Sequence, residues 1–208
     1  MMRIAIIDYR MSNLFSIMNA LHSLDFKPEI ISRPELLKGF DAAVLPGVGS
    51  FPNAMHNLKK YSLDEPIIEF VKTGKPLMGI CLGMQLLLES SEEFEGSKGL
   101  SIIEGSTIRF DNHSSINIIP HVGWNSVRVS NNVTSSHPLG GIKDGDFFYF
   151  VHSLYVKPKN RSTVLTYTTH DDFEFCSSIS YENIFASQFH PEKSGEKGLR
   201  ILNNFFTI

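Results

Sequence analysis

The stretch Gly79-Ile80-Cys81-Leu82-Gly83-Met84-Gln85 decides the fold, because it predicts a sharp turn between a strand and a helix. The apolar run Lys75-Pro76-Leu77-Met78 precedes it and has strand character, and Leu86-Leu87-Leu88-Glu89 follows it and is typical of a helix. A G-x-C-x-G pattern at such a turn matches a nucleophile elbow. The glycines leave room where strand, helix and substrate crowd together, and a helix N-terminus favours a thiolate. The alternative is a buried, inert cysteine between glycines that serve helix packing.

A histidine and a carboxylate near the other end of the chain complete a candidate catalytic set. The segment Gln188-Phe189-His190-Pro191-Glu192-Lys193-Ser194 follows an apolar run with strand character. On an extended segment, residues two apart point the same way, so His190 and Glu192 are expected to face one site. A nucleophilic cysteine needs a base, and the base needs an orienting group. The sequence therefore predicts a triad of Cys81, His190 and Glu192.

The first 90 or so residues alternate between buried-strand and helix patterns. Predicted strands are Arg3–Ile7, Pro28–Ile31 and Ala42–Leu45, and predicted helical segments cover 14–24, 34–40, 52–58 and 63–73. Such alternation favours right-handed crossovers and an α/β fold with a flavodoxin-like, doubly wound, mostly parallel sheet. In such sheets the site lies beyond the carboxyl ends of the strands, where the elbow also lies.

The second half predicts short strands in hairpins and then a closing helix. The expected strands are Val127–Val129, Phe147–Val151, Ser162–Thr168 and Glu174–Ile179, and the expected helix is Gly195–Phe206. These patterns indicate an antiparallel or mixed extension of the sheet. We find no linker or internal repeat, so we expect residues 1–208 to form one domain.

Composition excludes several classes of protein. The net charge is −3 and no basic block is present, so we expect no nucleic acid and no membrane partner. Only two cysteines occur, which predicts no disulfide framework and fits a reducing cytoplasm. The start of the chain lacks the pattern of a signal peptide. We expect no metal and no cofactor, since ligand spacing is missing around His22, His56, His113, His137 and His170.

The motifs above resemble those of a known enzyme family. The elbow and His190-Pro191-Glu192, together with Leu45-Pro46-Gly47-Val48-Gly49-Ser50-Phe51, are similar to class I (triad-type) glutamine amidotransferases. Three further stretches resemble the glutaminase subunits of imidazole glycerol phosphate synthases. They are Ile7-Asp8-Tyr9, Pro120-His121-Val122-Gly123-Trp124-Asn125 and Tyr149-Phe150-Val151-His152-Ser153. The resemblance runs from about residue 3 to about residue 206.

The resemblance implies roles for residues around the elbow. The N–H groups of Leu82 and of Val48 or Gly49 would form an oxyanion hole. Gln85 lies four residues after Cys81 and is expected to face the same pocket. By the resemblance Gln85 binds glutamine, together with Gly49 and the backbone at Ser153 and Leu154, where an aromatic residue is more usual than Leu154.

The resemblance also places a partner interface on the later segments. It assigns Pro120, Trp124, Asn125 and Tyr149 to the contact with a synthase subunit. Taken alone, a single tryptophan such as Trp124 is more often part of a hydrophobic core.

The implied function is glutamine hydrolysis through a cysteine thioester. The ammonia would pass to a (β/α)-barrel cyclase partner in a heterodimer of histidine biosynthesis. Arg10 stands where the family usually has glycine, and this keeps open a paralogous glutaminase subunit that supplies ammonia for amidation of a surface-polysaccharide sugar. A more remote alternative is a non-catalytic interaction subunit on the same fold.

Overall fold

A mixed sheet of 12 strands runs through the part of the chain that the computed structural model describes, residues 2–94, 96–112, 116, 118–130 and 138–207. Five of its strands are parallel neighbours in the order β2-β1-β3-β4-β14. These strands are β1 (Arg3–Ile7), β2 (Lys27–Ile31), β3 (Ala42–Leu45), β4 (Leu77–Ile80) and β14 (Ile184–Ser187). Strands β3, β4 and β14 are buried along their whole length, as expected for parallel strands covered on both faces.

Antiparallel pairing dominates the other half of the sheet. Strand β14 pairs antiparallel with β13, which is followed by β11, β7, β5 and β6, while β12 pairs with both β13 and β9. Their bounds are β5 (Leu88–Ser91), β6 (Ser97–Lys98), β7 (Ile103–Arg109), β9 (Arg128–Val129), β11 (Leu154–Pro158), β12 (Val164–His170) and β13 (Phe173–Tyr181). The predicted parallel sheet with a mixed extension is therefore confirmed.

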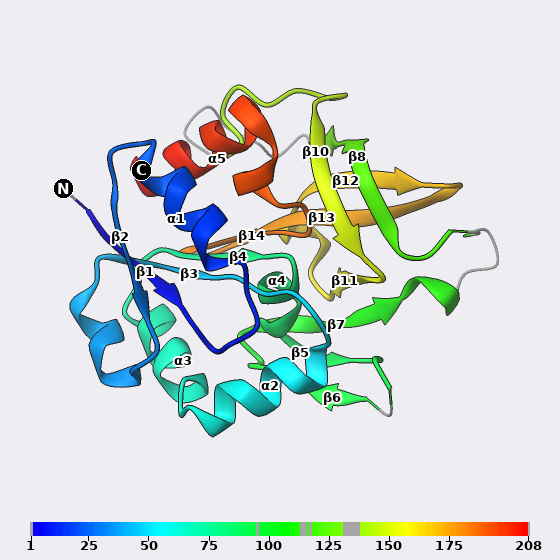
Figure 1. The fold of residues 1–208 in the computed structure, drawn as a ribbon. Coiled ribbons are helices and arrows are strands. Elements are labelled where there is room, and N and C mark those ends of the chain that lie inside the picture. Colours follow the sequence, from blue (N-terminus) through cyan, green and yellow to red (C-terminus); the bar gives the residue numbers. More distant parts are fainter. Residues whose placement is uncertain (1, 95, 113–115, 117, 131–137, 208) are drawn as a thin grey trace.

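A separate two-stranded sheet lies beside β12 and β13 of the mixed half. Its strands β8 (His121–Ser126) and β10 (Phe147–His152) pair antiparallel and stand on the right of Figure 1. The sequence analysis expected β10 but did not identify β8 as a strand. The glycine and asparagine of β8 are residues with low strand propensity, and this explains the omission.

Helices cover both faces of the sheet (Figure 1). Helices α1 (Leu14–His22) and α5 (Gly195–Thr207) pack on one apolar cluster, and α2 (Phe51–Lys60) and α3 (Asp64–Lys72) pack on the other. Short 3₁₀ turns are η1 (Pro34–Gly39), η2 (Phe110–Asn112), η3 (Arg161–Thr163) and η4 (Pro191–Lys193). Within the described ranges, no helix has the length and apolar character needed to cross a bilayer.

The helix after the elbow is shorter than the sequence analysis expected. Helix α4 covers only Leu82–Leu86, and the chain enters strand β5 at Leu88. The predicted helical assignment of Leu88-Glu89 was therefore wrong. Leu86, Leu87 and Leu88 are all fully buried, and a short apolar run of this kind fits a buried strand as well as a buried helix.

The elbow itself is tightly packed around the nucleophile. Cys81 has φ 54° and ψ −111°, a conformation that few non-glycine residues adopt. A Cβ added at Gly83 would lie 1.8 Å from the Leu45 carbonyl oxygen, and one at Gly79 would lie 3.0 Å from the Leu87 side chain. Gly83 thus lets α4 pack directly against the end of β3.

We predict that Gly83→Ala destabilises the protein by about 2 kcal/mol or more, because the clash is with backbone that cannot move aside. Urea unfolding measures the change. Gly39→Ala is the matched control, since nothing lies within 4 Å of its added Cβ. We expect the control to stay within about 0.5 kcal/mol of the wild type. Equal stability of the two variants would contradict the close packing at Gly83.

Candidate active site

Parallel pairing of β4 with β14 brings the elbow and the His190-Pro191-Glu192 segment together. Ile80 is paired with Ser187, and the Cys81 N–H donates to the Ser187 carbonyl oxygen at 2.7 Å. His190 follows three residues later, and its Nδ1 lies 2.8 Å from Glu192 Oε1. Cys81, His190 and the Glu192 side chain are all buried. Three predicted triad residues therefore meet at the carboxyl ends of β4 and β14.

The local conformation of the histidine–glutamate pair differs from the expected extended segment. His190 is extended, but Pro191–Lys193 form the 3₁₀ turn η4. Proline favours the first position of a helical turn because its ring fixes φ and its missing N–H is not needed there. The turn still carries the Glu192 carboxylate back to His190.

The electrostatics of His190 reflect two anionic neighbours. Burial lowers the pKa of His190, but the charge of the nearby Cys81 sulfur and hydrogen bonding to Cys81 and Glu192 outweigh burial and raise the pKa overall. Because Nδ1 is held by Glu192, Nε2 is the ring nitrogen that can exchange a proton at the site. Nε2 is buried, and within the described residues no partner meets the full hydrogen-bond geometry with it. This arrangement favours a thiolate–imidazolium pair.

A cavity of about 250 Å³ opens above the Cys81 sulfur. It is smaller than the cavities that hold most drug-sized ligands, and this suits an amino acid. Its lining includes every oxyanion and substrate residue named from the sequence and several that were not. The lining residues are Val48, Gly49, Cys81, Leu82, Gln85, Glu93, Pro120, Val151, His152, Ser153 and Leu154.

Glu93 is a cavity residue that sequence reasoning missed. It lies between β5 and β6, and its carboxylate accepts the N–H of Phe51 at the start of α2. It is the acidic side chain of the cavity lining. No motif marks it, because a lone glutamate in a loop between short strands is most often solvated.

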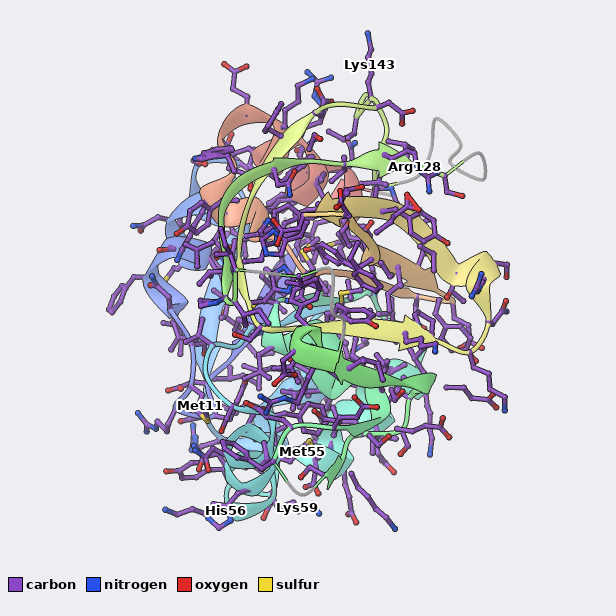
Figure 2. All side chains as sticks on the ribbon, turned by 90° about the vertical axis from the view of Figure 1, so that its right-hand side faces the viewer. Met11, Met55, His56, Lys59, Arg128 and Lys143 are labelled. Atoms are coloured by element: carbon purple, nitrogen blue, oxygen red, sulfur yellow. The ribbon has the colours of Figure 1, made fainter. Side chains whose placement is uncertain are left out.

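The predicted oxyanion loop is held in place by two hydrogen bonds. The buried Tyr9 hydroxyl donates to the Pro46 carbonyl oxygen at 2.7 Å, and burial raises the pKa of Tyr9 far above its ordinary range. The Val48 N–H donates to the Met11 carbonyl oxygen at 2.8 Å. Met11 is labelled in Figure 2. In this conformation the Val48 N–H is therefore engaged by a protein carbonyl, and the prediction that Val48 or Gly49 donates to an oxyanion stays a prediction.

Gln85 faces the cavity as expected, but its amide nitrogen is hydrogen-bonded to other groups of the protein. Nε2 donates to the Leu154 carbonyl oxygen at 3.3 Å and to Gln188 Oε1 at 3.0 Å. The Leu154 carbonyl oxygen also accepts from His152 Nδ1 at 2.7 Å. This carbonyl is thus committed to two protein donors, so the expected backbone contact with glutamine would have to use other groups at Ser153 and Leu154.

The predicted interface residues are exposed or half-buried. Trp124 is 55% exposed and is therefore not a core residue, and its ring meets Tyr149 edge-on at 6.3 Å between centroids. The Tyr149 carbonyl oxygen accepts the His190 N–H at 2.9 Å. Asn125 is half-buried and donates to the Thr169 carbonyl oxygen at 2.8 Å, and Pro120 is exposed at the cavity lining. The surface of β8 and β10 is therefore continuous with the site.

Two buried histidines connect β8 to the cavity wall. Asn125 Nδ2 lies 3.1 Å from His121 Nε2, and His121 Nδ1 lies 2.9 Å from His152 Nε2. The carbonyl acceptor at Leu154 makes His152 Nδ1 a donor, so Nε2 accepts from His121 Nδ1, and both rings are neutral. Burial lowers the pKa of His121 to about 4 and that of His152 to about 3. For His121, the neighbouring His170 lowers it further.

The remaining histidines belong to no cluster of metal ligands. Among the described residues, no group of three or more His, Cys, Asp or Glu side chains is placed so that it could hold a metal ion. His22 and His56 are exposed, and Figure 2 labels His56 on α2. His170 Nε2 donates to the Ile118 carbonyl oxygen at 2.7 Å. The predictions for His113 and His137 fall outside the described residues.

Arg10 occupies a backbone position that explains the glycine usual there. Its φ is 69°, in the left-handed region, which glycine adopts without cost. The Asp8 carboxylate accepts the Arg10 N–H at 2.8 Å and lies 3.4 Å from its guanidinium. Asp8 therefore stabilises the turn that the arginine would otherwise strain, and the departure from the family pattern leaves the triad untouched.

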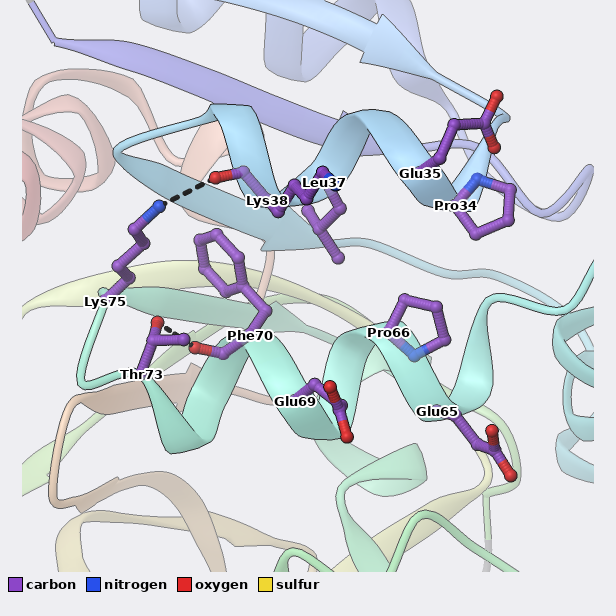
Figure 3. A pocket seen from close by; sticks show the side chains of 10 residues that line it. All are labelled: Pro34, Glu35, Leu37, Lys38, Glu65, Pro66, Glu69, Phe70, Thr73 and Lys75. Carbon is purple, nitrogen blue, oxygen red and sulfur yellow. Dashed lines mark hydrogen bonds between the residues drawn. The ribbon is translucent and has the colours of Figure 1, made fainter.

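A larger cavity of about 450 Å³ lies between η1 and α3, near the start of β4 (Figure 3). Cys81 lies at the other end of the same strand. Lys75 crosses one side of this cavity and donates to the Lys38 carbonyl oxygen at 2.9 Å. The cavity contains no nucleophile–base pair and is separate from the site described above.

Comparison with known proteins shows the family of the chain. The family model for glutamine amidotransferase class-I matches residues 5–208. The chain is 44% identical to "Imidazole glycerol phosphate synthase subunit HisH" of Helicobacter hepaticus, covering 100% of this chain and 99% of that protein. It is 46% identical to the protein of the same name from Methanocaldococcus jannaschii, covering 99% of each.

Solved structures are similar in fold. The structure of PurLQS from Thermotoga maritima contains a chain with a TM-score of 0.74 at 20% identity, covering 100% of this chain and 99% of that one. The glutaminase domain of Trypanosoma brucei CTPS, solved with bound acivicin, has a TM-score of 0.67 at 16% identity.

We predict that the folded protein loses stability as the pH falls from about 6.5 towards 3. The folded-state pKa values of His121 and His152 are depressed below the ordinary 6.5, so the unfolded chain binds more protons across this window. Each histidine contributes up to about 1.4 kcal/mol per pH unit to the slope. Urea unfolding measured at several pH values determines it.

His121→Gln should flatten the dependence by roughly one proton, whatever its effect on absolute stability. His56→Gln, on the exposed side of α2, controls for the loss of a histidine. An unchanged slope in His121→Gln would contradict a neutral, buried His121.

Proposed function

The chain belongs to the class I glutamine amidotransferases and, within them, to the HisH subunits of imidazole glycerol phosphate synthase, and on this premise we propose that Cys81 hydrolyses glutamine and that the ammonia feeds a second subunit. The observation that carries the mechanism is the meeting of Cys81, His190 and Glu192 beside a small cavity. We further propose that residues 1–208 act as one glutaminase domain.

In the proposed reaction the Cys81 thiolate attacks the side-chain amide carbon of glutamine. A carbon–sulfur bond forms, and the carbonyl oxygen becomes an oxyanion. His190 Nε2, protonated by the thiol, gives that proton to the departing nitrogen as the carbon–nitrogen bond breaks. Ammonia leaves and a thioester remains. Water, deprotonated by His190, then attacks the thioester and releases glutamate and the Cys81 sulfur.

The surrounding residues have separate roles in this proposal. Glu192 fixes the imidazole tautomer through the 2.8 Å contact with Nδ1 and stabilises the imidazolium. The first N–H groups of α4 have no intrahelical partner, so Leu82 can donate to the oxyanion together with Gly49. Glu93 supplies a negative charge for the α-ammonium group of glutamine. The side chain of Gln85, with Ser153 and Leu154, forms the cavity wall against the α-amino and carboxylate end of the substrate.

The proposed partner is a (β/α)-barrel cyclase subunit, HisF-like, in a heterodimer of histidine biosynthesis. Ammonia is protonated in bulk water, so it must travel inside a complex to react as a nucleophile. The exposed apolar side chains of Val122 and Trp124 lie on β8, which begins directly after the cavity residue Pro120, and they suit such a docking surface. A cytoplasmic location fits, because a reducing compartment keeps the Cys81 thiol free.

Both alternatives have less support. The relatives reported above carry the name of the synthase subunit, and this favours the histidine pathway over a surface-polysaccharide paralogue. The hydrogen-bonded His190–Glu192 pair beside Cys81 favours an enzyme over a non-catalytic interaction subunit.

We predict that Cys81→Ala lowers glutamine hydrolysis by at least about 10³-fold and abolishes labelling by a glutamine-analogue chloroketone. Ammonia release and mass spectrometry of the labelled peptide are the measurements. Cys176→Ala is the matched control, because Cys176 is a buried free cysteine whose pKa burial raises well above the usual range. The control should keep both activity and labelling. Labelling that persists in Cys81→Ala would refute the assignment.

We predict that Trp124→Ala weakens binding of the barrel cyclase subunit from the same organism by about 30-fold, as for a buried aromatic anchor. Isothermal titration measures the affinity, and glutaminase assays with the cyclase and its substrate measure the coupling. Leu36→Ala is the control, because Leu36 is also an exposed apolar side chain but lies on η1, away from β8. Wild-type affinity in Trp124→Ala would exclude the β8 surface as the interface.

A further inference from the structure

Gln188 is a buried side chain next to the nucleophile that neither the triad nor the cavity lining includes. It is completely inaccessible to solvent and lies directly after β14, which runs beside β4 in Figure 1. Its Nε2 lies 3.6 Å from the Cys81 sulfur, within hydrogen-bond range for sulfur. The hydrogen bond from the Cys81 N–H to Ser187 fixes the backbone beside it.

The orientation of the Gln188 amide follows from its neighbours. Gln85 Nε2 donates to two acceptors, the Leu154 carbonyl oxygen and Gln188 Oε1. A flipped Gln85 would place its oxygen against the Leu154 carbonyl, which has no proton to give. Gln85 is thus fixed as the donor, and Gln188 must present its oxygen to Gln85 and its NH₂ group to the sulfur.

The sulfur therefore has a different partner in each protonation state. As a thiol, Cys81 can donate to the Val151 carbonyl oxygen at 3.7 Å. As a thiolate, it has only acceptor capacity, and the Gln188 N–H donates to it. The titratable groups that face the sulfur are the His190 imidazole, which favours the thiolate, and the buried Tyr9 hydroxyl. A donor to the charged form stabilises that form. In a site this buried, little water competes for the interaction.

We propose that Gln188 is a further catalytic residue, whose side-chain amide donates to the Cys81 sulfur, stabilises its thiolate and holds it towards the substrate. The proposal rests on the proposed glutaminase function for its catalytic consequence. The hydrogen bond itself does not depend on the identity of the substrate. Gln188 does not itself line the cavity, so its side chain contacts Cys81 and Gln85 rather than the substrate.

The test uses Gln188→Met, which keeps the length of the side chain and removes the N–H donor. The pH dependence of Cys81 alkylation by iodoacetamide, followed by peptide mass spectrometry on the full chain, reports the thiolate directly. We expect the pH midpoint to rise by about one unit, the size typical of a hydrogen bond to a charged group. In complex with the cyclase, kcat for glutamine should fall about tenfold or more at pH 7 while KM changes less than twofold.

Gln188→Glu is the second variant. A carboxylate can accept from Gln85 but cannot donate to sulfur, and its charge opposes the thiolate, so its midpoint should rise further than that of the methionine variant. Thr107→Val is the matched control, since Thr107 is a fully buried polar residue on β7 that does not line the cavity. We expect a wild-type midpoint in this control.

A folded Gln188→Met variant whose midpoint stays within 0.2 unit of the wild type overturns the proposal. If both Gln188 variants fail to fold, the wild-type protein decides, because the Gln188 side-chain amide protons must then shift in NMR spectra with the alkylation midpoint. A constant resonance overturns the proposal as well. Wild-type protein that is alkylated normally but never hydrolyses glutamine would refute the proposed function and leave the Gln188 comparison intact.

Discussion

The parallel pairing of β4 with β14 is the constraint on which the site depends. It joins a segment near residue 80 to one near residue 187 in the middle of the sheet, where both strands are fully buried. Because parallel strands end at the same edge, the nucleophile and its base emerge side by side. A shift of this register would separate Cys81 from His190 and would also break the hydrogen bond between the Cys81 N–H and Ser187.

The sequence predicted the parts of this arrangement that local patterns encode. Continuous apolar runs at β1, β3 and β4 identified the buried strands, and the elbow glycines predicted crowding at the turn. That the crowding at Gly83 comes from the end of β3 is seen only in the structure. The G-x-C-x-G pattern around Cys81 and the His190-Pro191-Glu192 segment predicted the triad. The helix expected through Leu88 was wrong because three consecutive buried leucines carry no period that separates helix from strand.

Other features depend on contacts that no local pattern contains. Glu93 reaches the cavity only because the turn between β5 and β6 folds back to the start of α2. The Val48 N–H is occupied by the Met11 carbonyl, a partner from a different loop. The neutral state of His121 and His152 follows from burial and from a carbonyl acceptor on another strand. Such properties come from the tertiary neighbourhood rather than from residue type.

The carbonyl oxygen of Leu154 has two lone pairs, and His152 and Gln85 occupy both. Rotating this peptide would leave two buried donors without an acceptor, at a cost of about 1–3 kcal/mol for each. The cavity wall is consequently rigid at this point, and the rigidity limits how the protein can diverge. Variants that admit a longer or bulkier amide would have to gain space near Gly49. The opposite wall at Leu154 cannot move without breaking the hydrogen bonds of His152 and, through it, of His121 on β8.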